Sequence, residues 1–192
     1  MQLKDGLLLL VIFFSFYVEA QISTELEKKN GFRNIELSDR VDYYTYGSNL
    51  KMFKKLDSIA ANPFEGASNF NYKYVKPDHE KIGNSKIIGI YVKTLEKKIY
   101  QISVFVKRDD NLFSTLKNAY GSPIAEIGFN DPEAKIKLMS WTGGDVNCKF
   151  YSIENLPYQE LRYYSFKLSE EAESDMKNKV SEKNKLKALK EF

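Results

Sequence analysis

Apolar residues recur at helical spacing in two separate stretches of the chain, and the two stretches resemble each other. In both, they fall at positions i, i+1, i+4, i+7 and i+8, which aligns them along one face of a helix. The first set is Met52, Phe53, Leu56, Ile59 and Ala60, and the second is Leu112, Phe113, Leu116, Ala119 and Tyr120. The two sets lie 60 positions apart. We therefore predict two amphipathic helices, the second with Asp110 as N-cap and Gly121 at its end.

Three strand-like segments follow each predicted helix. They cover residues 70–75, 86–92 and 98–106 after the first helix, and 134–141, 146–153 and 161–168 after the second. Residues 94–97 and 142–145 are typical of tight hairpin turns, which join antiparallel strands. The sequence thus predicts an α+β protein in which helices cover one face of an antiparallel sheet. The repeated order also suggests a duplicated helix-three-strand unit, over about 48–107 and 109–168.

The ends of the chain differ from this central domain, which we place at residues 21–168. Residues 169–192 form a charged tail whose acidic residues come first and whose lysines come later. This order suits a helix macrodipole, with Ser169 as the expected N-cap. The apolar stripe of the tail is thin, so we expect a helix lying mostly in solvent. Docking of its basic end on an acidic surface is the alternative.

The first twenty residues predict a secretory signal peptide. Lys4 gives a positive charge to the start, and Leu7–Val18 is apolar except for one serine. Small residues precede Gln21, so cleavage is expected after Ala20. The apolar run is shorter than the roughly 20 residues that span a bilayer. We therefore expect an exported protein, periplasmic or extracellular, that does not span the membrane after cleavage.

Composition narrows the class of partner. The chain has 192 residues, of which 43% are hydrophobic and 29% charged, as in a globular protein. Its net charge of +3 is mild and the charges are mixed, so nucleic acid is not an expected partner. Cys148 is the only cysteine, which excludes an internal disulfide and a metal site built on paired cysteines.

The residues that could carry catalysis are few. His79 is the only histidine, and alternation places Cys148 on an apolar strand face, where a free cysteine is usually inert. Residues 130–133 could coordinate calcium but are typical first of a proline turn. We therefore predict no catalytic residue, no metal and no cofactor. A hydrolase using paired carboxylates on a glycan or peptide stays open, because sequence spacing does not fix their separation in space.

The chain is unusually rich in aromatic residues, with thirteen tyrosines and thirteen phenylalanines. Many of them fall in predicted strands, and tyrosine suits contact surfaces because it combines a large apolar area with a polar tip. The candidate binding residues are Tyr72, Tyr74, Tyr91 and Tyr163. The alternative is that these side chains belong to the core or are covered by the N-terminal segment. Trp141 is expected to be a core anchor.

Three stretches carry a resemblance to known proteins. They are Gly31–Leu37, Asp109–Pro123, and Trp141 with the glycine turn that follows it. On these residues the chain resembles uncharacterised small exported proteins of Bacteroidota-type bacteria, which implies export but no particular activity. The predicted architecture is similar to that of beta-lactamase inhibitor proteins and of small outer-membrane-assembly lipoproteins. The chain lacks the paired cysteines of the former and the lipid-anchor cysteine of the latter, so neither role transfers.

These observations favour a non-enzymatic binding module of the bacterial envelope or exterior, whose partner is another envelope or secreted protein. Two other classes remain as alternatives: the carboxylate hydrolase, and an immunity or inhibitor protein that neutralises a toxin.

Overall fold

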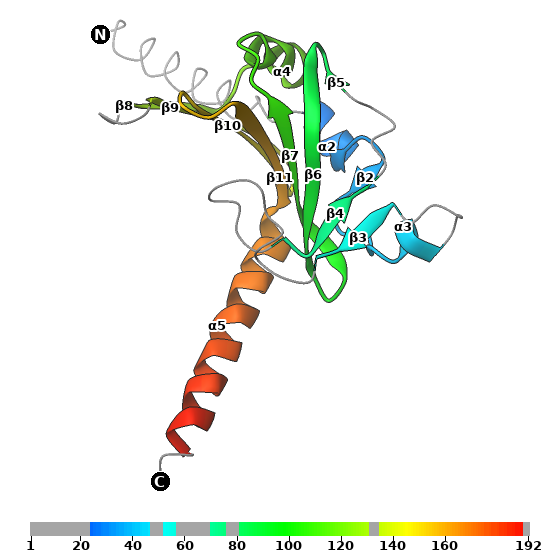
Figure 1. Cartoon of the computed structure of the whole chain (residues 1–192), viewed down its shortest axis with the longest axis vertical. Helices are drawn as coiled ribbons and strands as arrows, with labels where there is room; N and C mark the ends of the chain where they lie inside the picture. The colour runs from blue at the N-terminus through cyan, green and yellow to red at the C-terminus, as the bar shows by residue number, and fades with distance from the viewer. Residues whose placement is uncertain (1–23, 47–51, 57–69, 76–80, 131–134, 190–192) are drawn as a thin grey trace, which may run out of the picture.

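The computed structural model describes residues 24–46, 52–56, 70–75, 81–130 and 135–189. Within them, nine strands form one open antiparallel sheet in the order β3-β4-β6-β7-β11-β10-β9-β8, with β5 paired to β6 (Figure 1). The strands are β3 (Phe53–Lys55), β4 (Tyr72–Tyr74), β5 (Lys81–Ile82), β6 (Ser85–Leu95), β7 (Lys98–Lys107), β8 (Ala125–Asn130), β9 (Lys135–Gly143), β10 (Val146–Ile153) and β11 (Tyr158–Ser165). The predicted α+β class with an antiparallel sheet is confirmed.

Four described helices and a small hairpin complete the fold. The helices are α2 (Thr24–Lys29), α3 (Tyr43–Tyr46), α4 (Leu112–Tyr120) and α5 (Phe166–Leu189), and the hairpin joins β1 (Gly31–Phe32) to β2 (Ile35–Glu36). In Figure 1, α5 leaves the end of β11 and projects away from the rest of the molecule. No described helix is both long and apolar enough to cross a membrane.

One face of the sheet, which we call the apolar face, packs against α4, α2 and the β1–β2 hairpin. Helix α4 buries Leu112 and Leu116, and α2 contacts both α4 and strands β9 and β10. Trp141 is 1% exposed, and its Nε1 donates to the carbonyl of Gly121 at 2.9 Å. The expected core anchor is thus confirmed, and its hydrogen bond ties β9 to the end of α4.

The prediction for α4 is confirmed at the C-terminal end of the helix and is wrong at the N-terminal end. Gly121 ends the helix with a φ of 82°, a left-handed value that glycine adopts without a steric cost. The N-cap is Asn111 and not Asp110. Asn111 makes no side-chain capping bond, but the Asp109 side chain, two residues earlier, accepts a hydrogen bond from the Asn111 N–H at 2.9 Å and so fixes the entry to the helix one residue later than predicted.

Both predicted hairpin turns are present. Gly144 turns the chain between β9 and β10 with a φ of 59°. Glu96 and Lys97 turn it between β6 and β7 with φ values of 47° and 70°. In the β6–β7 turn, positive φ at both central residues matches the twist of the flanking strands, and in the β9–β10 turn Gly144 alone has a positive φ.

The first predicted helix is wrong where the structure describes it. Phe53–Lys55 form strand β3, and residues 57–60 of the prediction lie outside the described residues. Phe53 pairs with Tyr74 across β3 and β4, and their ring centroids are 5.3 Å apart. Such cross-strand aromatic pairs stabilise a sheet and outweigh a helical spacing of apolar residues. The two candidate repeat units therefore start differently, one with a strand and the other with a helix.

The predicted boundary between the last strand and the tail is also wrong. Strand β11 ends at Ser165, and residues 166–168 belong to the first turn of α5. Ser165 Oγ accepts a hydrogen bond from the Leu168 N–H at 3.1 Å, as an N-cap does, so the cap lies four residues before Ser169. Asp145, in the β9–β10 turn, accepts from the Lys167 N–H at 2.9 Å and from the Ser165 hydroxyl. The hairpin turn thus fixes where the helix begins.

Candidate functional site

The face of the sheet opposite the apolar face carries charged and aromatic side chains in its centre. The strand register places Arg162 opposite Ser103 and Lys149, and Glu160 opposite Phe105 and Tyr151. We call this the polar face and define it by Lys93, Gln101, Lys149, Tyr151, Glu160, Arg162 and Tyr164. A buried aromatic cluster of Phe70, Tyr91 and Phe105 adjoins it.

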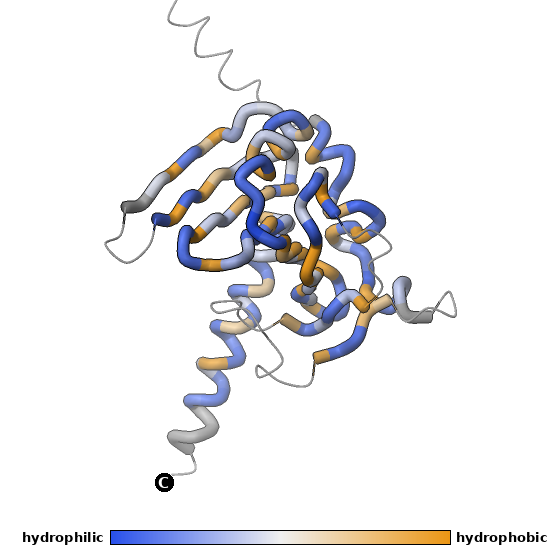
Figure 2. The backbone as a smooth tube through the Cα atoms, turned by 45° about the horizontal axis from the view of Figure 1, so that its top comes forward, coloured by the Kyte–Doolittle hydropathy of each residue, from blue (hydrophilic) through white to orange (hydrophobic). Residues whose placement is uncertain are grey.

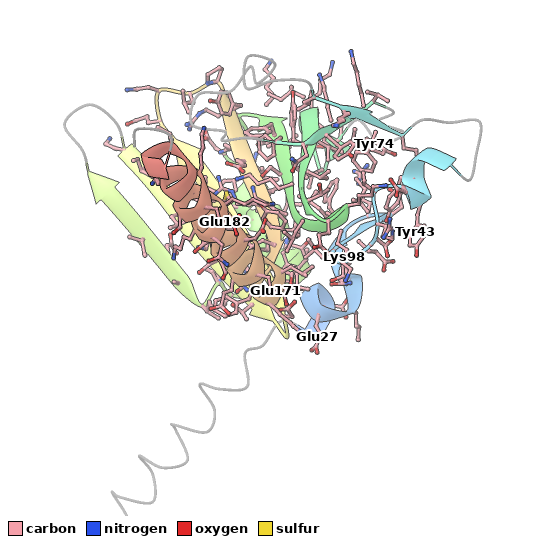
Figure 3. The ribbon with its side chains drawn as sticks, turned by 90° about the horizontal axis from the view of Figure 1, so that it is seen from below. Glu27, Tyr43, Tyr74, Lys98, Glu171 and Glu182 are labelled. Carbon is pink, nitrogen blue, oxygen red and sulfur yellow. The ribbon has the colours of Figure 1, made fainter. Side chains whose placement is uncertain are left out.

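A groove of about 440 Å³ lies between the polar face and the first turns of α5. We call it the α5 groove. Its floor and wall are formed by Lys93, Tyr100, Gln101, Lys149, Tyr151, Arg162 and Tyr164 from the sheet, and by Phe166, Ser169, Glu170, Ala172, Glu173 and Met176 from the helix. Figure 3, seen from below, has the projecting α5 in front of the sheet, and only the first turns of the helix contribute to the groove.

Arg162 of the floor pairs with Glu160, which lies beside the groove on the polar face. Arg162 donates from Nε to Glu160 Oε1 at 2.9 Å and from Nη2 to Oε2 at 2.8 Å, a bidentate pair. The guanidinium also lies 4.5 Å from the centre of the Tyr151 ring. Burial acts to lower the pKa of Arg162, but the hydrogen bonds and the charge of Glu160 outweigh it and raise that pKa. The charge of Arg162 is therefore held in place on the floor.

The two lysines of the floor lie close to aromatic rings. Lys149 Nζ lies 5.2 Å from the ring centre of Tyr164, and Lys93 Nζ lies 5.6 Å from that of Phe70. Burial lowers the pKa of Lys93, and the nearby charge of Arg162 lowers it further while Glu160 opposes the change. An acidic group brought into the groove would offset this loss of hydration.

Tyrosines and the helix wall supply the remaining polar groups. Burial raises the pKa values of Tyr100 and Tyr151, so both phenols are neutral near pH 7 and can donate or accept a hydrogen bond. The charge of Glu173 adds to the shift at Tyr100. Glu173 and Glu170 belong to α5, so the groove has basic groups on its floor and acidic groups on its wall.

The thiol considered for catalysis lies away from this groove. Cys148 is fully buried on the apolar face, and burial raises its pKa, which disfavours the reactive thiolate. His79 and residues 131–133 lie outside the described residues. In the part of the chain that the structure describes, no group of three or more His, Cys, Asp or Glu side chains is placed to hold a metal ion.

A second concavity, of about 490 Å³, lies between the start of α4 and strands β8 to β10. Most of its charged groups are engaged with one another or with the backbone. Lys137 pairs with Glu126 at 3.2 Å, and Arg108 donates to the carbonyls of Leu156 and Ile153. These contacts explain the local structure, so the α5 groove is the stronger candidate for binding.

The structure does not bring the four predicted binding tyrosines together. Tyr163 and Tyr74 are buried on the apolar face, where the Tyr163 hydroxyl lies 3.0 Å from that of Tyr120. Tyr91 is buried in the aromatic cluster beside the polar face, and Tyr72 is half-buried against the core. Burial leaves three of these four rings almost no surface for a partner. Tyr74, labelled in Figure 3, lies on the β3–β4 side of the molecule, away from α5.

The tyrosines that do line the groove are Tyr100, Tyr151 and Tyr164. The sequence held a signal for two of them. Alternation in 146–153 places Lys149 and Tyr151 opposite the apolar positions, and alternation in 158–165 does the same for Arg162 and Tyr164. A basic residue next to tyrosine on the polar side of two paired strands therefore indicates the site.

No protein family, curated protein or solved structure matches this chain. The residues of the groove are therefore the basis of the functional proposal.

Proposed function

We propose that this chain is an exported, non-enzymatic binding module whose contact site is the α5 groove. The observation that carries the proposal is the polar face itself: charged and aromatic side chains are ordered in mutual contacts at the edge of a groove, on a sheet whose other face already holds the core. Export rests on the predicted leader, residues 1–20. Intact-mass measurement of the secreted form tests it, since cleavage should leave Gln21 as the first residue.

The chemistry of the groove suits a partner that presents acidic groups beside a flat apolar surface. Lys149 can pair with a carboxylate, and the rings of Tyr151 and Tyr164 can pack against apolar or aromatic groups. An envelope or secreted protein, our predicted class of partner, can present both kinds of group on one segment.

The contacts of three carboxylates, Asp42, Asp109 and Glu160, favour binding over the hydrolase alternative. A glycosidase-type acid needs a carboxyl group whose pKa is raised. Hydrogen bonds from Lys97 lower the pKa of Asp42, and a hydrogen bond from Ser85 lowers that of Asp109. Glu160 is committed to Arg162 by two hydrogen bonds. These carboxylates are suited to structural pairing.

Affinity capture with matched variants tests the proposal. The exported protein is used to capture partners from envelope and culture fractions, next to a Lys149→Glu/Tyr164→Ala variant of the groove. Lys117→Glu, an exposed change on α4, serves as the control. We expect one partner to be enriched by the wild type and the control and lost with the groove variant. A partner retained equally by all three proteins would place the contact elsewhere.

A further inference from the structure

Helix α5 carries a seam of exposed side chains that is complementary to itself. The seam consists of Glu173, Met176, Val180 and Lys183, whose spacing of three, four and three residues keeps them on one side of the helix. Met176 is 53% exposed and Val180 is 60% exposed, and Glu173 and Lys183 are also exposed. Read along the chain, the seam is acidic, apolar, apolar and basic.

The outer part of α5 lacks the packing that normally stabilises a helix. The helix has 24 residues, so it is about 36 Å long at 1.5 Å per residue. Leu168 and Ala172 are buried at its base, but every described side chain from Met176 to Asn184 is exposed. Figure 2 shows this stretch as mostly hydrophilic with separate hydrophobic positions. Isolated helices of about 12–15 residues are marginal in water, so a partner along this stretch would stabilise it.

We propose that a second copy of this chain pairs with α5 in an antiparallel helix pair. With Met176 opposite Val180 of the second copy, Glu173 falls opposite its Lys183, and a two-fold axis repeats both contacts. The interface then has four apolar side chains at its centre and one ion pair at each end. A parallel pair would place like charges opposite each other, so the charge order selects the antiparallel arrangement.

The helix macrodipole accounts for part of this charge order but not for the seam. Acidic residues near the start and basic residues near the end stabilise a single helix. The macrodipole gives no reason for two exposed apolar residues between Glu173 and Lys183 on the same side. Pairing accounts for both, and it places the Lys183 of the second copy at the rim of the α5 groove, where Glu173 lies.

Sedimentation of the full exported chain tests this proposal. Concentrations from about 1 μM to about 1 mM cover the range in which small interfaces dissociate. We expect the wild type to dimerise. Glu173→Lys and Lys183→Glu should each weaken the dimer about tenfold, because each change places like charges opposite each other at both ends. An equimolar mixture of the two variants should restore the affinity, because every end then has one acidic and one basic group.

Glu171→Lys is the matched control, since the same change on the opposite side of the same turn should leave the dimer intact. Circular dichroism checks that each variant keeps its helix content. A wild type that stays monomeric, single variants that dimerise normally, or a mixture that fails to recover would each overturn the proposal. So would a monomer whose lysines bind vesicles containing anionic phospholipid, because that result assigns the basic half of α5 to a lipid surface. Glu173 and Met176 also line the α5 groove, but dimerisation is measured on the protein without a groove partner, so a failure to dimerise leaves the affinity-capture result of the proposed function standing.

Discussion

The two faces of the sheet are built from alternate residues of the same strands, yet one forms the core and the other borders a groove. In β10, Val146, Cys148 and Phe150 are buried on the apolar face, while Lys149 and Tyr151 belong to the polar face. The apolar face is covered by helices and a hairpin. The polar face keeps charged groups at the edge of a groove. A single alternating strand can therefore contribute to a core and to a contact surface together. Substitutions on the two faces should differ in their effect on the free energy of unfolding.

The largest effect is expected on the apolar face, from Trp141→Ala. The change removes a fully buried ring and the hydrogen bond to Gly121, and we expect it to lower the free energy of unfolding by about 3–5 kcal/mol. Tyr151→Ala on the polar face is the matched comparison. Its ring is only half-buried, so the cost should be well below that of Trp141→Ala. Urea unfolding measures both, and equal costs would contradict the difference between the faces.

On the polar face, the largest cost should come from breaking one charge pair. Glu160→Ala leaves Arg162 partly buried without its bidentate partner, since the two side chains are 11% and 30% exposed. We expect a loss of about 1–3 kcal/mol in the free energy of unfolding. Glu126→Ala is the control, because its pair with Lys137 lies in solvent and should contribute below about 1 kcal/mol. If both changes lower the free energy of unfolding equally, the Glu160–Arg162 pair contributes no more to stability than an ion pair in solvent.

The apolar face should also respond to alkaline pH. Burial raises the pKa of Cys148 above its ordinary value of 9.0, so the folded state keeps the proton after the unfolded chain has lost it. Its contribution to stability is therefore fully present below pH 9 and falls above it, by about 1.4 kcal/mol per pH unit. Burial also raises the pKa of Tyr120 to about 12, which adds a loss above its ordinary value of 10.0.

Unfolding measured at several pH values between 7 and 10 separates the thiol from the tyrosines. Cys148→Ala should unfold with a shallower dependence on pH than the wild type, whatever its stability at pH 7. Identical slopes for the two proteins would show that the Cys148 proton is not linked to folding.

Local patterns predicted most of the sheet but not which face each aromatic ring occupies. The segment 146–153 is β10 without a change at either end, and both hairpin turns were read from their residues. Alternation along a strand assigns its residues to two faces of the sheet, but it does not indicate which face is covered by other parts of the chain. The burial of Tyr163 and Tyr74 depends on α2, α4 and the β1–β2 hairpin, which come from distant parts of the sequence.

The wrong helix prediction at Phe53 and the failure to predict the α5 groove have the same origin, which is contacts between residues that lie far apart in the sequence. Phe53 has helical spacing with its neighbours, but its position is decided by Tyr74 and by Tyr44, whose ring centroid is 5.5 Å away. The groove requires the base of α5 to lie beside β11 and β7, which no pattern within the tail indicates. The polar alternation of Lys149, Tyr151 and Arg162 is visible along their strands, but only the fold joins these residues to the helix wall.

The start of α5 offers the smallest and most discriminating test, because two serines compete for one role. Ser169 precedes the acidic residues and has the sequence features of an N-cap, whereas Ser165 makes the capping hydrogen bond to Leu168. Ser165→Ala should therefore lower the free energy of unfolding by about 1 kcal/mol, and Ser169→Ala should leave it nearly unchanged. Urea unfolding of the two variants measures the difference. A larger loss of stability for Ser169→Ala would indicate that the helix begins at Ser169. The first turn of α5 would then not be held by Asp145, and the wall of the α5 groove would differ from the one described.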